Sequence, residues 1–176
     1  GLRLVLPYAP RAIDIGTGAG FPGLPLKIAI PALRLVLVES VQKKAAFLHH
    51  IVDLLGLQDV EIAAVRAEEL AHLPQFRGTC DLAVSRAVAK MPTLTELALP
   101  FCRHGGVFVA YKGSAAPVEA ARARRAIALL GGELVGLREV KPLAALESRV
   151  LVVVRKTRRT PALYPRRAGV PAKNPL

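Results

Sequence analysis

The sequence has few cysteines and few acidic side chains, and it contains no long apolar run. Its two cysteines, Cys80 and Cys102, form no Cys-x-x-Cys pair and have no histidines at metal-ligand spacing. We therefore expect buried, reduced thiols in a cytoplasmic protein, and no metal site. No stretch approaches the roughly 18 uninterrupted apolar residues of a membrane-spanning helix, so we expect no membrane partner.

Acidic residues are outnumbered by basic ones. The 176 residues include 25 Lys and Arg against 13 Asp and Glu, which gives a formal net charge of +12. This excess is far beyond what solubility requires, and it predicts attraction to a polyanion, with nucleic acid as the leading class. With 52% hydrophobic residues, the chain is long enough for one core and too short for two ordinary domains.

Short apolar runs alternate with helical patterns along most of the chain. This alternation predicts an α/β fold with a doubly wound, mostly parallel sheet. The last two runs are separated by too few residues for a crossover helix, so they should form an antiparallel pair at the sheet edge. The predicted strands are 11–16, 33–40, 60–65, 80–87, 106–113, 133–140 and 148–156.

The helical pattern of residues 42–57 has an apolar stripe that should pack on the sheet, and Gly56 is suited to end the helix. Adjacent His49 and His50 point about 100° apart on a helix, so they cannot both bind one metal ion. The predicted stripe comprises Ala46, Phe47, His50, Ile51, Leu54 and Leu55.

The end of the chain is basic and rich in proline. We divide the chain into a core, 1–155, and a C-terminal tail, 156–176. Four prolines after residue 160 prevent a long helix, so the tail should run extended over the surface or stay mobile. A merely solvated terminus is the alternative to RNA binding. The candidate RNA contacts are Arg155, Lys156, Arg158, Arg159, Tyr164, Arg166, Arg167 and Lys173.

The stretch DIGTGAGFPG, residues 14–23, is the motif on which the functional prediction depends. Gly16, Gly18 and Gly20 follow the first predicted strand, where glycine lets the backbone approach a ligand. A dinucleotide loop needs its third glycine where Phe21 stands, and a triphosphate loop needs a Gly-Lys-Ser or Gly-Lys-Thr ending that is missing. The pattern therefore favours a nucleoside without phosphates.

Two acidic residues accompany the glycine loop. Asp14 precedes it, where a carboxylate can face an ammonium group or another cation. Glu39 ends the second predicted strand, where it can accept hydrogen bonds from a ribose diol. Both positions suit S-adenosylmethionine, which carries an ammonium, a sulfonium and both ribose hydroxyls. A tight turn in any α/β protein is the alternative explanation of the glycines.

The sequence resembles the glucose-inhibited division protein B family, bacterial methyltransferases that modify N7 of a guanine in 16S ribosomal RNA. The resemblance rests on DIGTGAGFPGLPLKI, RAEEL, SRAVA, YKG and TPALYPRRAGVPAKNPL, which span nearly the whole chain. It implies a Rossmann-like class I methyltransferase fold, S-adenosylmethionine as cofactor, and the small ribosomal subunit or its precursor as partner.

The resemblance also implies roles for particular residues. Glu39, Ser40 and Val41 meet the ribose and adenine, Ala67 and Glu68 approach the adenine, and Arg86 lies beside the methyl-transfer centre. The implied donor contacts are Asp14, Gly16, Thr17, Gly18, Gly20, Phe21, Glu39, Ser40, Val41, Ala67, Glu68 and Arg86.

Methylation at N7 agrees with a further absence in the sequence. N7 of guanine carries a lone pair and no proton, so the reaction needs no general base, and no convincing Ser/His/Asp or Cys/His set is present. Arg86 and Lys112 are the catalytic candidates, because either can donate a hydrogen bond to guanine O6. For single residues structural explanations remain, such as an ion pair for Arg86 and a helix N-terminal charge for Glu68.

The sequence departs from the family in two respects, and two other functions remain as alternatives. Glu39 stands where the family often has Asp. The family carries a helical segment before the first strand that this sequence lacks, so the resemblance does not assure full activity. The other functions are methyl transfer to a small molecule or protein, and RNA binding without catalysis.

Overall fold

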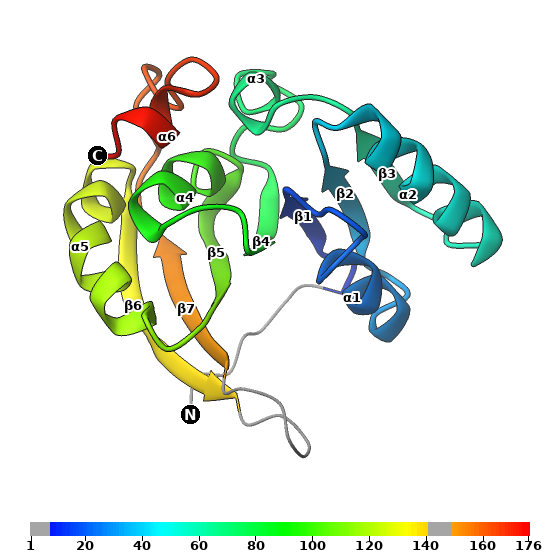
Figure 1. Ribbon diagram of the computed structural model, residues 1–176, viewed down its shortest axis with the longest axis horizontal. Coiled ribbons are helices and arrows are strands. Elements are labelled where there is room, and N and C mark those ends of the chain that lie inside the picture. Colours follow the sequence, from blue (N-terminus) through cyan, green and yellow to red (C-terminus); the bar gives the residue numbers. More distant parts are fainter. Residues whose placement is uncertain (1–7, 141–148) are drawn as a thin grey trace.

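The computed structural model describes residues 8–140 and 149–176 (Figure 1). Seven strands form one sheet in the order β3-β2-β1-β4-β5-β7-β6. The first five strands along the chain are mutually parallel, and β7 runs antiparallel to both of its neighbours. The strands are β1 Arg11–Ile15, β2 Arg34–Val38, β3 Val60–Ala63, β4 Cys80–Arg86, β5 Cys102–Lys112, β6 Gly132–Val140 and β7 Arg149–Lys156.

In the described residues six helices accompany the sheet, and the order of elements confirms the predicted doubly wound α/β fold with its antiparallel pair at one edge. The segment that joins the two strands of this pair lies outside the described residues. The helices are α1 Gly23–Ala29, α2 Gln42–Leu54, α3 Ala67–Leu70, α4 Met91–Ala98, α5 Ala116–Leu129 and α6 Val170–Lys173.

The helices cover both faces of the sheet, so the central strands are apolar on both sides. In β1, Ile13 and Ile15 belong to the core cluster shared with α3, α4 and α5. Ala12, which points to the opposite face, belongs to the cluster shared with α1 and α2. Cys80 and Cys102 are buried and free, as predicted.

The orientation of α2 differs from the prediction. Its buried residues are Ala45, Leu48 and Val52, spaced by three and then four residues. Phe47 and Leu54 of the predicted stripe are exposed by 46% and 69%. Apolar side chains lie on two sides of this helix, so periodicity finds the helix but does not decide which side meets the sheet.

The sheet reverses its winding between β1 and β4. Helix α1 follows β1 on one face, and α4 follows β4 on the other. The loops that leave the carboxyl ends of these adjacent strands therefore diverge, which creates the crevice where doubly wound sheets bind ligands.

The C-terminal tail returns to the core after β7. It crosses the helical face that contains α3 and α4 and ends in the short helix α6 (Figure 1). It is thus bent and docked on the core, with a helical turn, whereas the sequence predicted an extended or mobile segment.

In the part of the chain that the structure describes, no helix is long and apolar enough to cross a membrane. Within the same residues, no cluster of three or more His, Cys, Asp and Glu side chains is arranged to hold a metal ion.

Candidate active site

The loop after β1 requires glycine for two separate reasons. Gly16 has a φ of +64°, and a Cβ there would lie 2.5 Å from Cγ2 of Val88. Gly20 has a φ of +93°, and its Cβ would collide with the side chain of Leu24. Any other residue would strain the backbone and displace a neighbour. The loop therefore packs closely against both the segment after β4 and the start of α1.

Asp14 lies beneath this loop and is fully buried. Its Oδ2 accepts hydrogen bonds from Oγ1 of Thr17 at 2.6 Å and from the amide of Gly23 at 2.8 Å. Burial raises the pKa of Asp14 to about 6. We predicted a carboxylate facing the donor, but Asp14 borders neither cavity described below. Its position is that of a brace between β1, the loop and α1.

Glu39 occupies the carboxyl end of β2, as predicted. Its Oε2 accepts a hydrogen bond from the amide of Gly18 at 3.1 Å, and its Oε1 accepts one from the amide of Val41 at 2.9 Å. The carboxylate is therefore held between the glycine loop and the start of α2. Each oxygen keeps a lone pair that can accept a further hydrogen bond, such as one from a ribose hydroxyl.

A cavity of about 110 Å³ lies between the ends of β1 and β2 and the start of α3. The structure brings five predicted donor residues to it from three separate segments. Val88 also lines it; this residue belongs to the SRAVA motif but was not among the predicted donor contacts. The predicted residues in the wall are Gly16, Glu39, Ser40, Ala67 and Glu68.

A larger cavity of about 550 Å³ shares Gly16 with the first. Its described lining is basic, with Lys44, Arg86, Lys112 and Arg149 and no acidic side chain. Tyr111 also lines it, and burial raises the pKa of this tyrosine. Among the predicted residues it contains Gly16, Thr17, Gly18, Phe21, Arg86 and Lys112.

Arg86 and Phe21 stack at this larger cavity. Cζ of Arg86 lies 5.3 Å from the centroid of the Phe21 ring, within the range of a cation–π interaction. Both side chains are exposed, Phe21 by 48%. They border the same cavity as the glycine loop, so a planar base that enters it meets a guanidinium and an aromatic ring.

Lys112 has a structural role that the sequence did not indicate. Its Nζ donates a hydrogen bond to Oε2 of Glu119 at 2.8 Å and another to the carbonyl of Ala89. The same Glu119 oxygen accepts a hydrogen bond from the amide of Met91. Lys112 thus joins the end of β5 to α4 and α5, which leaves Arg86 as the better placed of the two catalytic candidates.

Lys156 was predicted to contact RNA, and the structure contradicts this. The residue is 3% exposed, and its Nζ donates to the carbonyls of Leu99 and Leu130 and contacts Oγ1 of Thr160. Burial lowers the pKa of Lys156 to about 8. Its ammonium therefore joins the start of the tail to the core and is not an exposed contact for RNA.

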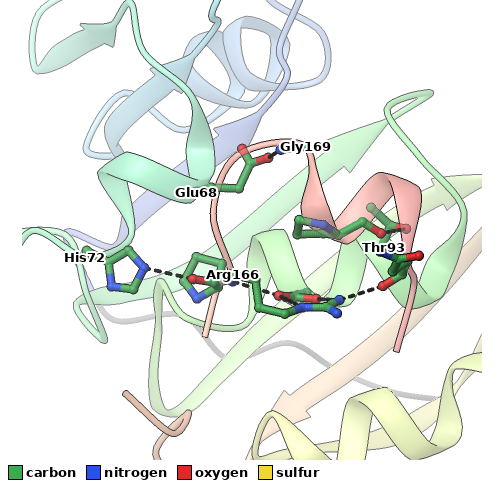
Figure 2. A network of polar contacts seen from close by, with 9 residues as sticks. Glu68, His72, Thr93, Arg166 and Gly169 are labelled. Atoms are coloured by element: carbon green, nitrogen blue, oxygen red, sulfur yellow. Dashed lines mark hydrogen bonds and ion pairs between the residues drawn. The ribbon is translucent and has the colours of Figure 1, made fainter. Parts of the chain in front are cut away.

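Arg166 was also predicted to contact RNA, and its side chain is likewise bound to the core. Its Nε and Nη2 donate to the two oxygens of Glu96 at 2.9 and 2.6 Å, and its amide donates to Glu96 as well (Figure 2). Glu96 is fully buried in α4, and its hydrogen bond raises the pKa of Arg166. The guanidinium is engaged in this ion pair, so it is not the free side chain that the prediction of an RNA contact assumed.

Further contacts dock the tail along α3 and α4 (Figure 2). Nε2 of His72 donates to the carbonyl of Pro165 at 2.8 Å, and Oγ1 of Thr93 donates to the carbonyl of Pro171 at 2.9 Å. Oε1 of Glu68 accepts a hydrogen bond from the amide of Gly169 at 3.0 Å. Because Glu68 lines the smaller cavity, the tail is attached to the wall of the candidate site.

The remaining tail residues keep a surface position. Tyr164 is half-buried and packs against the core. The exposed basic residues, which remain candidate RNA contacts, are Arg155, Arg158, Arg159, Arg167 and Lys173.

The two cavities fit S-adenosylmethionine by their chemistry. Glu39, fixed by two amides, offers acceptors for a ribose diol in the smaller cavity, which Gly16 joins to the larger one. The glycine loop lets the backbone come close to the ligand. Oδ1 of Asp14 has no hydrogen-bond partner in the described residues, so an acceptor remains behind the loop.

Comparison with known families gives a single consistent answer. The family model of rRNA small subunit methyltransferase G matches residues 2–145. The chain belongs to this family. Its members are S-adenosylmethionine-dependent methyltransferases of ribosomal RNA, as the resemblance implied.

Curated relatives support membership in the rRNA small subunit methyltransferase G family. The protein of this name from Roseiflexus castenholzii is 55% identical over 166 residues, which cover 94% of this chain and 70% of the relative. The protein of this name from Dehalococcoides mccartyi strain CBDB1 is 49% identical over 166 residues, with coverage of 94% and 71%.

Solved structures support the fold. A mutant of the 16S rRNA (adenine(1408)-N(1))-methyltransferase from Catenulisporales acidiphilia has a TM-score of 0.70 at 13% identity, covering 86% of this chain and 87% of that one. TYW2 from M. jannaschii, in complex with AdoMet, has a TM-score of 0.68 at 16% identity, with coverage of 89% and 72%. The Rossmann-like methyltransferase fold predicted for this chain is thus confirmed.

Proposed function

We propose that this chain transfers the methyl group of S-adenosylmethionine to N7 of a guanine in the 16S ribosomal RNA of the small subunit or its precursor, in the cytoplasm. The observation that carries the proposal is the pair of cavities that meet at Gly16. One contains the oriented carboxylate of Glu39, and the other is lined by basic side chains. Membership of rRNA small subunit methyltransferase G supplies ribosomal RNA as the substrate class.

Residues of three strand ends would hold the donor. Glu39 and Ser40 face its ribose, Ala67 and Glu68 its adenine, and the glycine loop lies where the two cavities join. When bound, S-adenosylmethionine supplies an electrophilic methyl group. The chain's own contribution is to bind and orient the two reactants, which can lower the barrier by several kcal/mol, up to about 10.

The lining of the larger cavity favours a target atom that carries no proton. Among the described residues that line it there is no Asp, Glu or His to serve as a general base. Burial raises the pKa of Tyr111, which keeps this phenol protonated. N7 of guanine has a free lone pair and needs no base, whereas an amino or hydroxyl group would have to lose a proton.

Arg86 is placed to orient the guanine. Its guanidinium carries donors that suit guanine O6, and its stack on Phe21 holds it beside the larger cavity. A hydrogen bond to O6 also keeps this positive charge on the ring edge, away from direct contact with the methylated nitrogen. In this proposal Arg86 is the catalytic residue, and Lys112 positions the end of β5.

The positive charge of the chain supports RNA binding. We propose that the exposed tail residues Arg167 and Lys173 contact phosphates near the target nucleotide, while the docked part of 156–176 belongs structurally to the core. Binding should then weaken steeply as the salt concentration rises, because each phosphate contact releases counterions.

The decisive experiment measures transfer of labelled methyl groups to unmodified 16S ribosomal RNA and to small subunits, followed by chemical cleavage at N7-methylguanine. We expect one labelled site. The same assay with the full-length Roseiflexus castenholzii relative, of which the match covers 70%, tests whether the uncovered part of that relative adds to the activity. Label on a protein or small molecule, or RNA binding without donor binding, would overturn the proposal.

A further inference from the structure

A third cavity, of about 400 Å³, lies at the opposite end of β5 from the candidate site. It is formed by the turn around residue 77, the start of β5 and the segment after β7. Of its ten lining residues, six carry basic side chains and none is acidic. The basic ones are Arg77, Arg103, His104, Lys156, Arg158 and Arg159.

This cavity is remote from the donor site. Arg103, which lines it, and Tyr111, which lines the larger donor-side cavity, both belong to β5 and are eight residues apart. Strand β5 is irregular between them, so the distance is better taken from β4, where Cys80 pairs with Cys102 and Arg86 pairs with Tyr111. Six residues at about 3.3 Å per strand residue correspond to roughly 20 Å. A ligand of the third cavity therefore does not touch the reacting atoms.

Most of the positive charge in this cavity is not neutralised by carboxylates. Arg77 donates to the carbonyls of Ala71, Thr160 and Pro161, and Lys156 also donates to carbonyls. Within the described residues, Arg103 is the one lining residue that pairs with a carboxylate, that of Asp81 at 2.6 Å.

The local electrostatics show the same excess of positive charge. Burial, together with the nearby charge of Arg77, lowers the pKa of Lys156 to about 8. Burial also lowers the pKa of Arg77. The cations are thus held together by carbonyl groups against their own repulsion, an arrangement that a bound anion would stabilise.

Arg159 is the side chain most readily available to an anion. It is exposed, and it makes no hydrogen bond or ion pair with any other described residue. His104 is exposed beside it in the same lining. Arginine donors form a planar fork that matches the oxygens of a phosphate.

We infer that this third cavity binds a phosphate of the RNA backbone, far from the methylated guanine. The inference rests on the proposed function, because it takes the RNA to be the substrate of the donor site. Contacts at both ends of β5 mean that the substrate is a folded RNA that reaches around the β5–β7 side of the sheet. A short oligonucleotide around the guanine would bind only at the donor site.

The test reverses one charge at each of two places. Arg159→Glu changes the third cavity, and Lys43→Glu is the matched control, because Lys43 is exposed on α2 and lines none of the three cavities. Affinity for unmodified 16S ribosomal RNA is measured over a series of salt concentrations. Donor affinity is measured by calorimetry and folding by thermal unfolding.

We expect Arg159→Glu to weaken RNA binding about tenfold at 0.1 M salt and to reduce the slope of log K against log salt by about 1. The KM for RNA should rise with kcat unchanged, and donor affinity and unfolding should match those of Lys43→Glu. Methylation of a short oligonucleotide should not distinguish the two variants.

Two outcomes would overturn the inference. In the first, both variants bind the RNA equally, with the same salt dependence. In the second, inorganic phosphate binds to the unaltered chain and not to Arg159→Glu, while the two proteins bind RNA with the same affinity. The cavity would then be a site for a small anion. Failure of the proposed function is distinct, since it means that the unaltered chain methylates no RNA.

Discussion

The glycine loop and the C-terminal tail differ in how far apart their contacting residues lie in the sequence. In the loop, Asp14 binds Thr17 and Gly23, three and nine positions along the chain. In the tail, Arg166 binds Glu96 across 70 positions, and Lys156 binds Leu99 across 57. A motif with local contacts can be interpreted from its sequence. A charged side chain with a distant partner cannot be distinguished from a free one.

The largest expected effect tests the tail. Arg166→Ala leaves the buried carboxylate of Glu96 without its partner, and breaking such a pair costs about 3–5 kcal/mol of unfolding free energy. Urea unfolding followed by circular dichroism measures the loss.

The neighbouring residue provides the control for this variant. Arg167 is exposed, so Arg167→Ala should stay within about 0.5 kcal/mol of the unaltered chain. Equal urea midpoints for the two variants would show that the tail is not anchored through Glu96.

The second prediction concerns the buried acid beneath the loop. Burial raises the pKa of Asp14 from 3.8 to about 6, so between these values the folded chain holds a proton that the unfolded chain has lost. Protonation of Asp14 therefore stabilises the fold at low pH. About 3 kcal/mol of this stabilisation is lost as the pH rises through 6.

Asp14→Asn isolates this contribution. Its amide oxygen can still accept the hydrogen bonds from Thr17 and Gly23, but it does not titrate. Unfolding free energies of both proteins are measured in urea from pH 4 to 7. As the pH rises, the variant should become more stable relative to the unaltered chain. Parallel pH profiles would assign the titration to another group.

The third prediction tests how closely the loop packs. Gly16→Ala places a methyl group 2.5 Å from Val88, which lines the smaller cavity, and overpacking of this kind costs about 1–3 kcal/mol. Displacement of Val88 into the cavity should weaken donor binding about 10- to 100-fold in calorimetry.

Gly56→Ala is the matched control for this variant. Gly56 follows α2 and lines none of the three cavities; it also has a positive φ, +60°, and a Cβ there has no atom within 4 Å. Its backbone strain of about 1–2 kcal/mol should appear in stability and not in donor affinity. If both variants weaken donor binding equally, loss of stability matters and the contact with Val88 does not.

The sequence predicted the features that depend on local pattern. Strand periodicity and the length of the connections predicted the doubly wound sheet and its antiparallel edge, which the structure confirms. The spacing of the glycines and the position of Glu39 predicted residues that border the cavities at the strand ends. Strand ends in a parallel sheet meet at one edge, so local motifs there predict a shared site.

The features that the sequence did not predict depend on three-dimensional packing. The buried side of α2 could not be chosen from its periodicity, because both sides carry apolar residues. Lys112 and Arg166 have acidic partners on other elements, and Val88 reaches the site through the bend after β4. Ala87 at that bend has a φ of +58°, a conformation that no local sequence pattern indicated.

The smallest expected effect lies where the two regions meet. Glu68 lines the smaller cavity and accepts the hydrogen bond from Gly169 of the tail. Glu68→Gln keeps an acceptor for this amide and removes the charge, so donor affinity should change less than about threefold. Glu68→Ala also removes the acceptor, and loss of one buried hydrogen bond costs about 1 kcal/mol. If the tail supports the cavity wall, this loss should weaken donor affinity about fivefold. Donor titrations that cannot distinguish Gln from Ala would show that the tail is docked beside the site without influence on it. A clear difference in donor affinity between the two variants would show that the tail, although distant in the sequence, supports the donor pocket.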